Sequence, residues 1–198
     1  MPDTSRPRPS RSARRDAPWR PTREQLAGAV GARVPDLIAA GLRVLLVGIN
    51  PGLYSGAVGH HFARPGNRFW RAIHAAGITP RVLSPFEERE LLELGVGITN
   101  LVARATATAD VLAPDELRAG GRRLRVKIRR WRPRVVAFLG VGAYRSAFAA
   151  PRAAIGRQAE GLETARVWLL PNPSGLNAHY QLGALADTFA AMWRDTPD

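Results

Sequence analysis

A chain of 198 residues has room for one domain with a substantial core, with or without a tail. Lys and Arg number 29 against 16 Asp and Glu, and the resulting formal charge of +13 favours a polyanionic partner over a neutral metabolite. The absence of cysteine excludes a disulfide framework, a thiolate nucleophile, cysteine-ligated zinc and iron–sulfur clusters.

The N-terminal segment differs in composition from the rest of the chain. Met1 to Arg23 contains seven arginines mixed with proline and serine, and almost no aliphatic side chains. Such a segment cannot bury enough apolar surface to offset its ordering entropy. We therefore predict a disordered basic tail over residues 1–23 and a single α/β domain over residues 24–198. The apolar runs are too short to span a membrane, and we expect a soluble, intracellular protein.

The domain is expected to open with one or two short helical stretches between Glu24 and Ala40, interrupted at Val34-Pro35. From Arg43 onward, short apolar runs alternate with amphipathic stretches. The apolar runs predict strands at Val44–Val47, Val96–Leu101, Val135–Leu139 and Val167–Leu170. The amphipathic stretches predict helices at Asn67–Ala76, Phe86–Leu94, Pro114–Trp131, which Gly120-Gly121 should weaken, and Ala178–Arg194. This alternation indicates a mainly parallel sheet covered on both faces.

Three polar loops follow predicted strands, and ligands of open α/β sheets bind beyond the carboxyl ends of the strands. We therefore expect the three loops to line one crevice. Pro51 stiffens the first loop, so that the Asn50 amide is held in place. Asn50 also suits a plain strand-to-loop turn, in which its side chain only hydrogen-bonds to nearby backbone amides. The loops are Gly48–Gly52, the stretch from Thr99-Asn100 to Arg104 and Thr106, and Pro171–Asn177.

Leu176 is an apolar residue on the last of these loops, which Pro171 and Pro173 stiffen. Beside a basic crevice, such a residue suits a wedge that is pushed between stacked bases. It also suits a staple that packs against the following helix. The residues alone leave both interpretations open.

Three motifs in order carry a resemblance to a known family. The chain resembles the mismatch-specific uracil/thymine DNA glycosylases of the uracil-DNA glycosylase superfamily from about Arg43 to the last helix. The Gly95–Thr106 stretch is similar to the middle segment of that family. The motifs are Gly48-Ile49-Asn50-Pro51-Gly52, Phe62-Ala63-Arg64-Pro65-Gly66-Asn67-Arg68-Phe69-Trp70 and Leu170-Pro171-Asn172-Pro173-Ser174-Gly175-Leu176.

The resemblance implies a three-layer α/β/α sandwich with a central, mainly parallel sheet. It implies a monofunctional enzyme of base excision repair that flips uracil, or thymine and other damaged pyrimidines, out of G-mismatched duplex DNA. The enzyme would hydrolyse the N-glycosidic bond and leave an abasic site, as a monomer and without metal or cofactor. Its partner would be double-stranded DNA with G:U or G:T mismatches, in the bacterial cytoplasm and associated with the nucleoid.

The resemblance also assigns roles to single positions. Asn50 matches the catalytic residue that holds the attacking water, and Asn100 resembles a second active-site Asn. Leu176 matches the wedge. Substrate-binding residues would be Ile49, Gly52, Phe62 and Thr106, and further DNA-binding residues Asn172, Ser174, Gly175 and Asn177. Tyr54 departs from the family pattern, but it lies in the loop between Asn50 and Phe62 where the pocket wall is expected, and we count it among the substrate-binding residues.

The residue types agree with slow hydrolysis of a deoxyribonucleoside. An Asn amide orients water but cannot accept its proton, so dissociation of the glycosidic bond should run ahead of attack. The charges that then develop on the sugar and the base need stabilisation by the site. Backbone donors and the Asn100 amide are expected to stabilise the leaving base.

Other interpretations stay open. Gly140-Val141-Gly142-Ala143-Tyr144-Arg145 partly matches a dinucleotide fingerprint with Glu160 downstream, but Arg145 replaces the third glycine, which favours a tight strand–helix turn over a nucleotide-binding protein. The basic run Arg122–Arg130 suits a non-catalytic DNA-binding module or a solvated helix face. His60 and His61 have no other His or acidic residue at ligand spacing, so no metal is predicted.

Overall fold

The computed structural model describes residues 20–175 and 180–197. Most of the predicted basic tail therefore lies outside the described residues. The same holds for Leu176 and Asn177, and for the predicted start of the last helix at Ala178.

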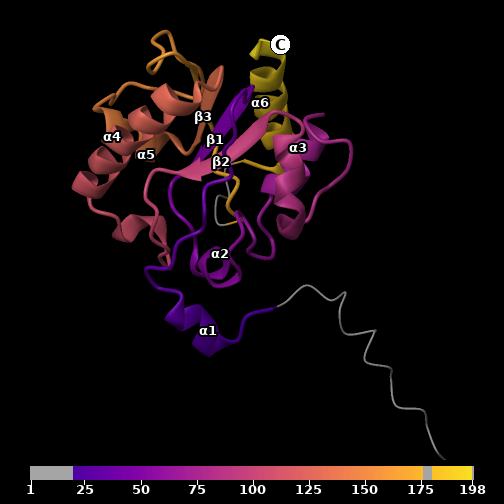
Figure 1. Ribbon diagram of the computed structural model, residues 1–198, viewed down its shortest axis with the longest axis vertical. Helices are drawn as coiled ribbons and strands as arrows, with labels where there is room; N and C mark the ends of the chain where they lie inside the picture. Colours follow the sequence, from indigo (N-terminus) through magenta and orange to yellow (C-terminus); the bar gives the residue numbers. More distant parts are fainter. Residues whose placement is uncertain (1–19, 176–179, 198) are drawn as a thin grey trace, which may run out of the picture.

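The centre of the fold is a five-stranded sheet in the order β2-β1-β3-β5-β4 (Figure 1). Neighbouring strands are parallel, except that β4 runs antiparallel to β5. The four predicted strands are confirmed to within one residue at either end, whereas the two-residue β4 was not predicted. The strands are β1 (Val44–Gly48), β2 (Val96–Asn100), β3 (Val135–Leu139), β4 (Gly156–Arg157) and β5 (Arg166–Leu170).

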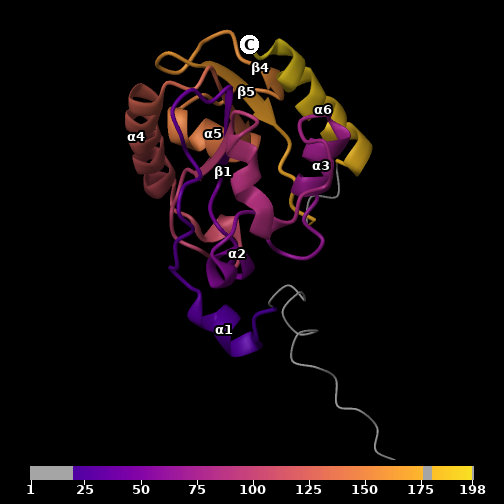
Figure 2. The same ribbon diagram turned by 45° about the vertical axis from the view of Figure 1, so that its right-hand side comes forward.

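Two hydrophobic clusters cover the two faces of this sheet. Side chains of a strand alternate between faces, so Val44 and Leu46 belong to one cluster and Leu45 and Val47 to the other. Figures 1 and 2 show α3 and α6 on one side of the sheet and α4 and α5 on the other. The three-layer α/β/α architecture is therefore confirmed. The covering elements are α3 (Phe69–Ala75), η2 (Pro85–Leu92) and α6 (Leu182–Asp195) on the first face, and α4 (Pro114–Trp131) and α5 (Val141–Phe148) on the second.

The glycine pair within α4 serves close packing. A Cβ atom on Gly120 would collide with the carbonyl oxygen of Leu101, and one on Gly121 would lie 3.0 Å from the carbonyl oxygen of Ala147. Both glycines are buried. The residues that lower the helix propensity of α4 thus allow it to approach both the loop after β2 and α5.

The segment before β1 was predicted incompletely. Only α1 (Arg23–Gly28) is helical, and the rest of the stretch up to Ala40 is not. Leu37 instead exchanges two backbone hydrogen bonds with Ile98, of 2.9 and 2.8 Å, and so covers the outer edge of β2. Pairing satisfies backbone groups at the edge of β2, and this stabilises the segment more than a second short helix would.

Further differences concern the helices. The stretch predicted as a helix at Phe86–Leu94 is the 3₁₀ helix η2, and α6 begins at Leu182. Besides β4, no range was predicted for α2 (Leu53–Val58), η3 (Ala109–Val111) or α5, which are too short to show a clear helical period in the sequence. Of these, α5 was implied only by the strand–helix turn at Gly140. Among the described residues, no helix combines the length and the apolar character needed to cross a membrane.

Candidate active site

A pocket of about 390 Å³ lies where the three polar loops meet at the carboxyl ends of the strands. Tyr54 is not among its lining residues, and neither is Gly175, which lies against Gly66. Leu176 and Asn177 lie outside the described residues. The pocket brings together eight of the residues to which the motifs assigned a role: Ile49, Asn50, Gly52, Phe62, Asn100, Thr106, Asn172 and Ser174.

The orientation of the Asn50 amide follows from its neighbours. Nδ2 lies 3.1 Å from the carbonyl oxygen of Pro51, 3.1 Å from that of Arg104 and 2.6 Å from Thr106 Oγ1. Carbonyl oxygens only accept hydrogen bonds, and Thr106 Oγ1 donates its own hydrogen to the carbonyl oxygen of Thr108 at 2.7 Å. The nitrogen must therefore face the protein, and Oδ1 is the atom left to accept a hydrogen bond from a ligand or water.

Gly48 makes room for the second Asn of the pocket. It is the register partner of Asn100 in the β1–β2 pair, at the carboxyl end of both strands. A Cβ atom on Gly48 would collide with Asn100 Oδ1 and would lie 3.5 Å from Cζ of Phe62. Glycine at this position thus lets the Asn100 amide and the Phe62 ring lie over the end of β1.

Phe62 is held in a fixed orientation. Its φ angle of +51° is in the left-handed region, which non-glycine residues rarely adopt and which is frequent at functional sites. Its ring stacks on the buried ring of Phe69, with centroids 4.1 Å apart and an interplanar angle of 21°. The pocket thus has a rigid aromatic wall onto which a planar base can stack.

Arg68 ties the third loop to the second motif. Its backbone nitrogen donates to the carbonyl oxygen of Pro173 at 3.1 Å, and its guanidinium donates to the carbonyl oxygen of Ser174 at 2.5 Å and to that of Tyr180. Ser174 and Tyr180 lie on the two sides of residues 176–179. Arg68 therefore joins both flanks of the segment that contains Leu176, a role that the sequence analysis missed because its partners are backbone atoms.

Residues 35–196 match the family model described as the uracil DNA glycosylase superfamily, which covers all three loops of the pocket. The chain belongs to this superfamily. It is accordingly a DNA glycosylase, a hydrolase that acts on damaged bases in DNA repair, and its substrate is DNA. The pocket built by Asn50, Phe62 and Asn100 is the candidate site for this chemistry.

The structure also explains the residues on which the nucleotide-binding and DNA-binding-module interpretations depended. Gly140 has a φ angle of +134°, and a Cβ atom there would lie 3.1 Å from Cδ1 of Ile49, so that glycine is required by the turn from β3 into α5. Within the basic run of α4, Arg125 and Arg129 each lie 3.1 Å from Glu163. These intramolecular ion pairs favour a structural role for part of the run over a DNA-binding module.

His60 and His61 share a partner that sequence spacing did not reveal. His60 Nδ1 lies 2.9 Å from Glu88 Oε1, while the backbone nitrogen and Nδ1 of His61 each lie 2.9 Å from Glu88 Oε2. Burial raises the pKa of Glu88, but the hydrogen bonds from His61 and His60 outweigh it and hold the pKa below its ordinary value. Glu88 is therefore an anion at neutral pH. Within residues 20–175 and 180–197, no group of three or more His, Asp or Glu side chains is arranged to hold a metal ion.

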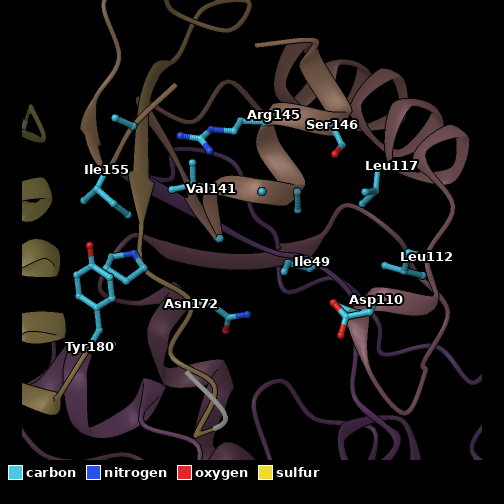
Figure 3. A pocket seen from close by; sticks show the side chains of 16 residues that line it. Ile49, Asp110, Leu112, Leu117, Val141, Arg145, Ser146, Ile155, Asn172 and Tyr180 are labelled. Atoms are coloured by element: carbon cyan, nitrogen blue, oxygen red, sulfur yellow. The ribbon is translucent and has the colours of Figure 1, made fainter. Parts of the chain in front are cut away.

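A wider groove of about 770 Å³ adjoins the pocket (Figure 3). Ile49, Asp110 and Asn172 line both hollows. Figure 3 shows the side chains of Asp110 and Asn172 on opposite walls, and those of Arg145 and Ser146 projecting from α5. The pocket and the groove therefore adjoin along these shared residues.

Proposed function

We propose that the chain is a monofunctional, monomeric DNA glycosylase that flips uracil, and also thymine or other damaged pyrimidines, out of G-mismatched duplex DNA. It hydrolyses the N-glycosidic bond and leaves an abasic site. The observation that carries this proposal is the clamped Asn50 amide, whose nitrogen is used by Pro51, Arg104 and Thr106 and whose oxygen is left for a water.

In this proposal the flipped base stacks on Phe62. A water molecule that enters the pocket from solvent donates a hydrogen bond to Asn50 Oδ1. An amide oxygen orients the water without taking its proton, so the glycosidic bond must be largely broken before the water attacks. The Asn100 amide, which lies over Gly48, is placed to hydrogen-bond to the base. The pocket thus positions the reactants without supplying a general base, and we expect slow hydrolysis for this reason.

The state of the single lysine supports hydrolysis over a lyase reaction. A lyase needs an amine that forms a Schiff base with the sugar. Lys127 is the only lysine of the sequence, and its ammonium lies 2.5 Å from Asp36 Oδ2 and 2.9 Å from Thr99 Oγ1. None of these three residues lines the pocket. The lysine thus holds β2 against the segment before β1 and lies away from the pocket, which supports water as the nucleophile.

The third loop supports the wedge role proposed for Leu176. Asn172 Oδ1 accepts a hydrogen bond of 3.0 Å from the backbone nitrogen of Ser174, which stiffens the loop on the pocket side. Arg68 joins that flank to Tyr180 on the other side. A wedge must stay in the duplex while the base is outside it, and a loop anchored on both flanks meets this need.

Replacing Arg68 by alanine should therefore reduce activity on duplex DNA more than on single-stranded DNA. The expected loss on uracil opposite guanine is about tenfold, the scale of a hydrogen-bonded charged group, because the wedge loop loses both anchors. Single-turnover rates on the two substrates measure the effect. Arg71→Ala is the matched control, since Arg71 is exposed on α3, the helix that Arg68 precedes. Equal losses on both substrates would show that Arg68 has no duplex-specific role.

A panel of duplexes tests the proposed base and mismatch preference. Each duplex carries uracil, thymine, hypoxanthine or ethenocytosine opposite each of the four bases, and single-turnover release of the base is followed at saturating protein. We expect uracil opposite guanine to be released faster than uracil opposite adenine, because a mismatched base is more easily unstacked. Equal rates opposite every base would reject the mismatch preference and leave the glycosylase activity standing.

A further inference from the structure

Phe62 adopts a backbone conformation that its residue type does not favour. Its φ angle of +51° lies in the left-handed region, a strain that persists only where the surrounding structure enforces it. No hydrogen bond from backbone to backbone joins residues 60–63 to any other described residue. The conformation of Phe62, and with it the direction of its ring, must therefore be determined by side chains.

Buried side chains hold the backbone on both sides of Phe62. The amide nitrogen of His61 donates to Glu88 Oε2 at 2.9 Å, and the amide nitrogen of Ala63 donates to Ser55 Oγ at 3.1 Å. Glu88 is 7% exposed and Ser55 is 5% exposed, so water competes little for either contact. The chain is thus held one residue before and one residue after Phe62 by side chains of η2 and α2.

Glu88 makes the larger share of these contacts. Its Oε1 also lies 2.9 Å from His60 Nδ1, and its Oε2 lies 2.9 Å from His61 Nδ1. A carboxylate only accepts hydrogen bonds, so each imidazole donates from Nδ1. With the His61 amide, three donors on two consecutive residues converge on one buried carboxylate, and its negative charge strengthens all three hydrogen bonds. The segment that leads into Phe62 is therefore fixed in one orientation.

Glu88 itself lies outside the pocket. It is not among the lining residues, whereas His61 and Phe62 both line the pocket. Burying a carboxylate is unfavourable unless hydrogen bonds compensate, and here the compensating donors all belong to His60 and His61. The next side chain along the chain is the Phe62 ring, which stacks on Phe69. The contacts of Glu88 thus lead to the aromatic wall of the pocket.

We propose that Glu88 is a positioning residue of the pocket, which holds the His60-His61 segment and thereby fixes Phe62 where a flipped base can stack on its ring. The inference deepens the proposed function and rests on it. Glu88 acts on the base only through Phe62, so its effect on the rate requires the Phe62 ring. A carboxylate that only stabilised the fold would change the rate by the same factor with or without that ring.

The test is a double-mutant cycle of Glu88→Ala and Phe62→Ala. Single-turnover release of uracil opposite guanine is measured at saturating protein, below the lowest melting temperature of the set. Glu88→Ala should slow release about tenfold, less than the roughly 100-fold cost of a full 1 Å misplacement, but less than about twofold when Phe62→Ala is already present. Glu88→Gln keeps an acceptor for the His61 amide and should recover most of the wild-type rate.

Two further variants keep the test decisive. Glu88→Asp keeps the charge but is one methylene too short for all three donors, so it repeats the cycle with a smaller loss if Glu88→Ala does not fold. Glu90→Ala is the matched control, because Glu90 is an exposed glutamate of η2 that pairs with Arg81 at 2.8 Å. It should leave the rate unchanged.

A nuclear Overhauser effect between the rings of Phe62 and Phe69 reports the position of Phe62 independently of activity. We expect it in wild type and Glu88→Gln, and expect it to weaken in Glu88→Ala. Equal loss factors with and without the Phe62 ring, or a ring contact that Glu88→Ala leaves unchanged, would overturn the role of Glu88. If wild-type protein releases no uracil, the proposed function fails instead, and the ring contact still tests what Glu88 holds.

Discussion

Replacing Asn50 by alanine is expected to lower the single-turnover rate of uracil release about 100-fold, the scale of losing one positioned catalytic group. The variant loses the oxygen that orients the water, while DNA affinity should stay close to wild type. Stability should fall by about 1–2 kcal/mol, because the carbonyl oxygens of Pro51 and Arg104 lose a shared donor. Rates at saturating protein, a DNA titration and urea unfolding measure the three quantities. An unchanged rate would remove Asn50 from the mechanism.

Asn50→Asp tests whether the hydrogen-bond donor of the Asn50 amide is required. A carboxylate could in principle stabilise a cationic sugar, but at this position one of its oxygens would face two carbonyl oxygens that need a donor. We therefore expect Asn50→Asp to be no faster than Asn50→Ala, and to be less stable at neutral pH than at acidic pH, where the carboxyl regains a hydrogen. A variant faster than wild type would show that charge at the sugar outweighs the amide's role as a donor.

Gly48→Ala is expected to separate activity from stability. The new methyl group collides with the amide of Asn100, which is the end of a short side chain and can swing aside at little cost to the fold. The displaced amide no longer meets the base, and Phe62, 3.5 Å away, is crowded as well. A misplacement of about 1 Å costs on the order of 100-fold in rate. We expect a loss of this size in uracil release with a melting temperature near that of wild type.

Gly183→Ala provides the matched control for this change. Gly183 lies in the first turn of α6, and a Cβ atom there would meet no atom within 4 Å. Alanine at this helical position should leave the rate unchanged and stabilise slightly. If Gly48→Ala kept the wild-type rate, Asn100 would have no part in holding the base. If Gly48→Ala unfolded the protein, Gly48 would be required for the packing of β1 and not mainly for the pocket.

The sequence predicts the sheet well because its strands are nearly continuous apolar runs. Val44–Gly48 and Val135–Leu139 are buried along their whole length, and such runs are visible without knowledge of the partner strands. The segment up to Ala40 was harder to predict, since its conformation depends on the exposed edge of β2 to which Leu37 binds. Tertiary pairing there overrides local helix propensity.

The candidate site was predictable where a motif is contiguous, and less so where it depends on distant contacts. The loops with Asn50, Asn100 and Asn172 converge as the parallel topology requires. Glu88 lies 27 positions from His61, on a short 3₁₀ helix that carries no functional pattern of its own. Arg68 acts through carbonyl oxygens, which every residue possesses. Contacts of these two kinds, a distant side chain and backbone oxygens, cannot be identified from the sequence one residue at a time.

The most direct test of hydrolysis at the Asn50 pocket is single-turnover release of free uracil from a duplex with uracil opposite guanine, with each sample divided and one half treated with alkali. We predict that wild-type protein releases uracil and that strand breaks form only in the alkali-treated half, in equal amount to the free base, whereas Asn50→Ala releases uracil about 100 times more slowly. Strand breaks without alkali, no free uracil from wild-type protein, or an equally fast Asn50→Ala variant would contradict it.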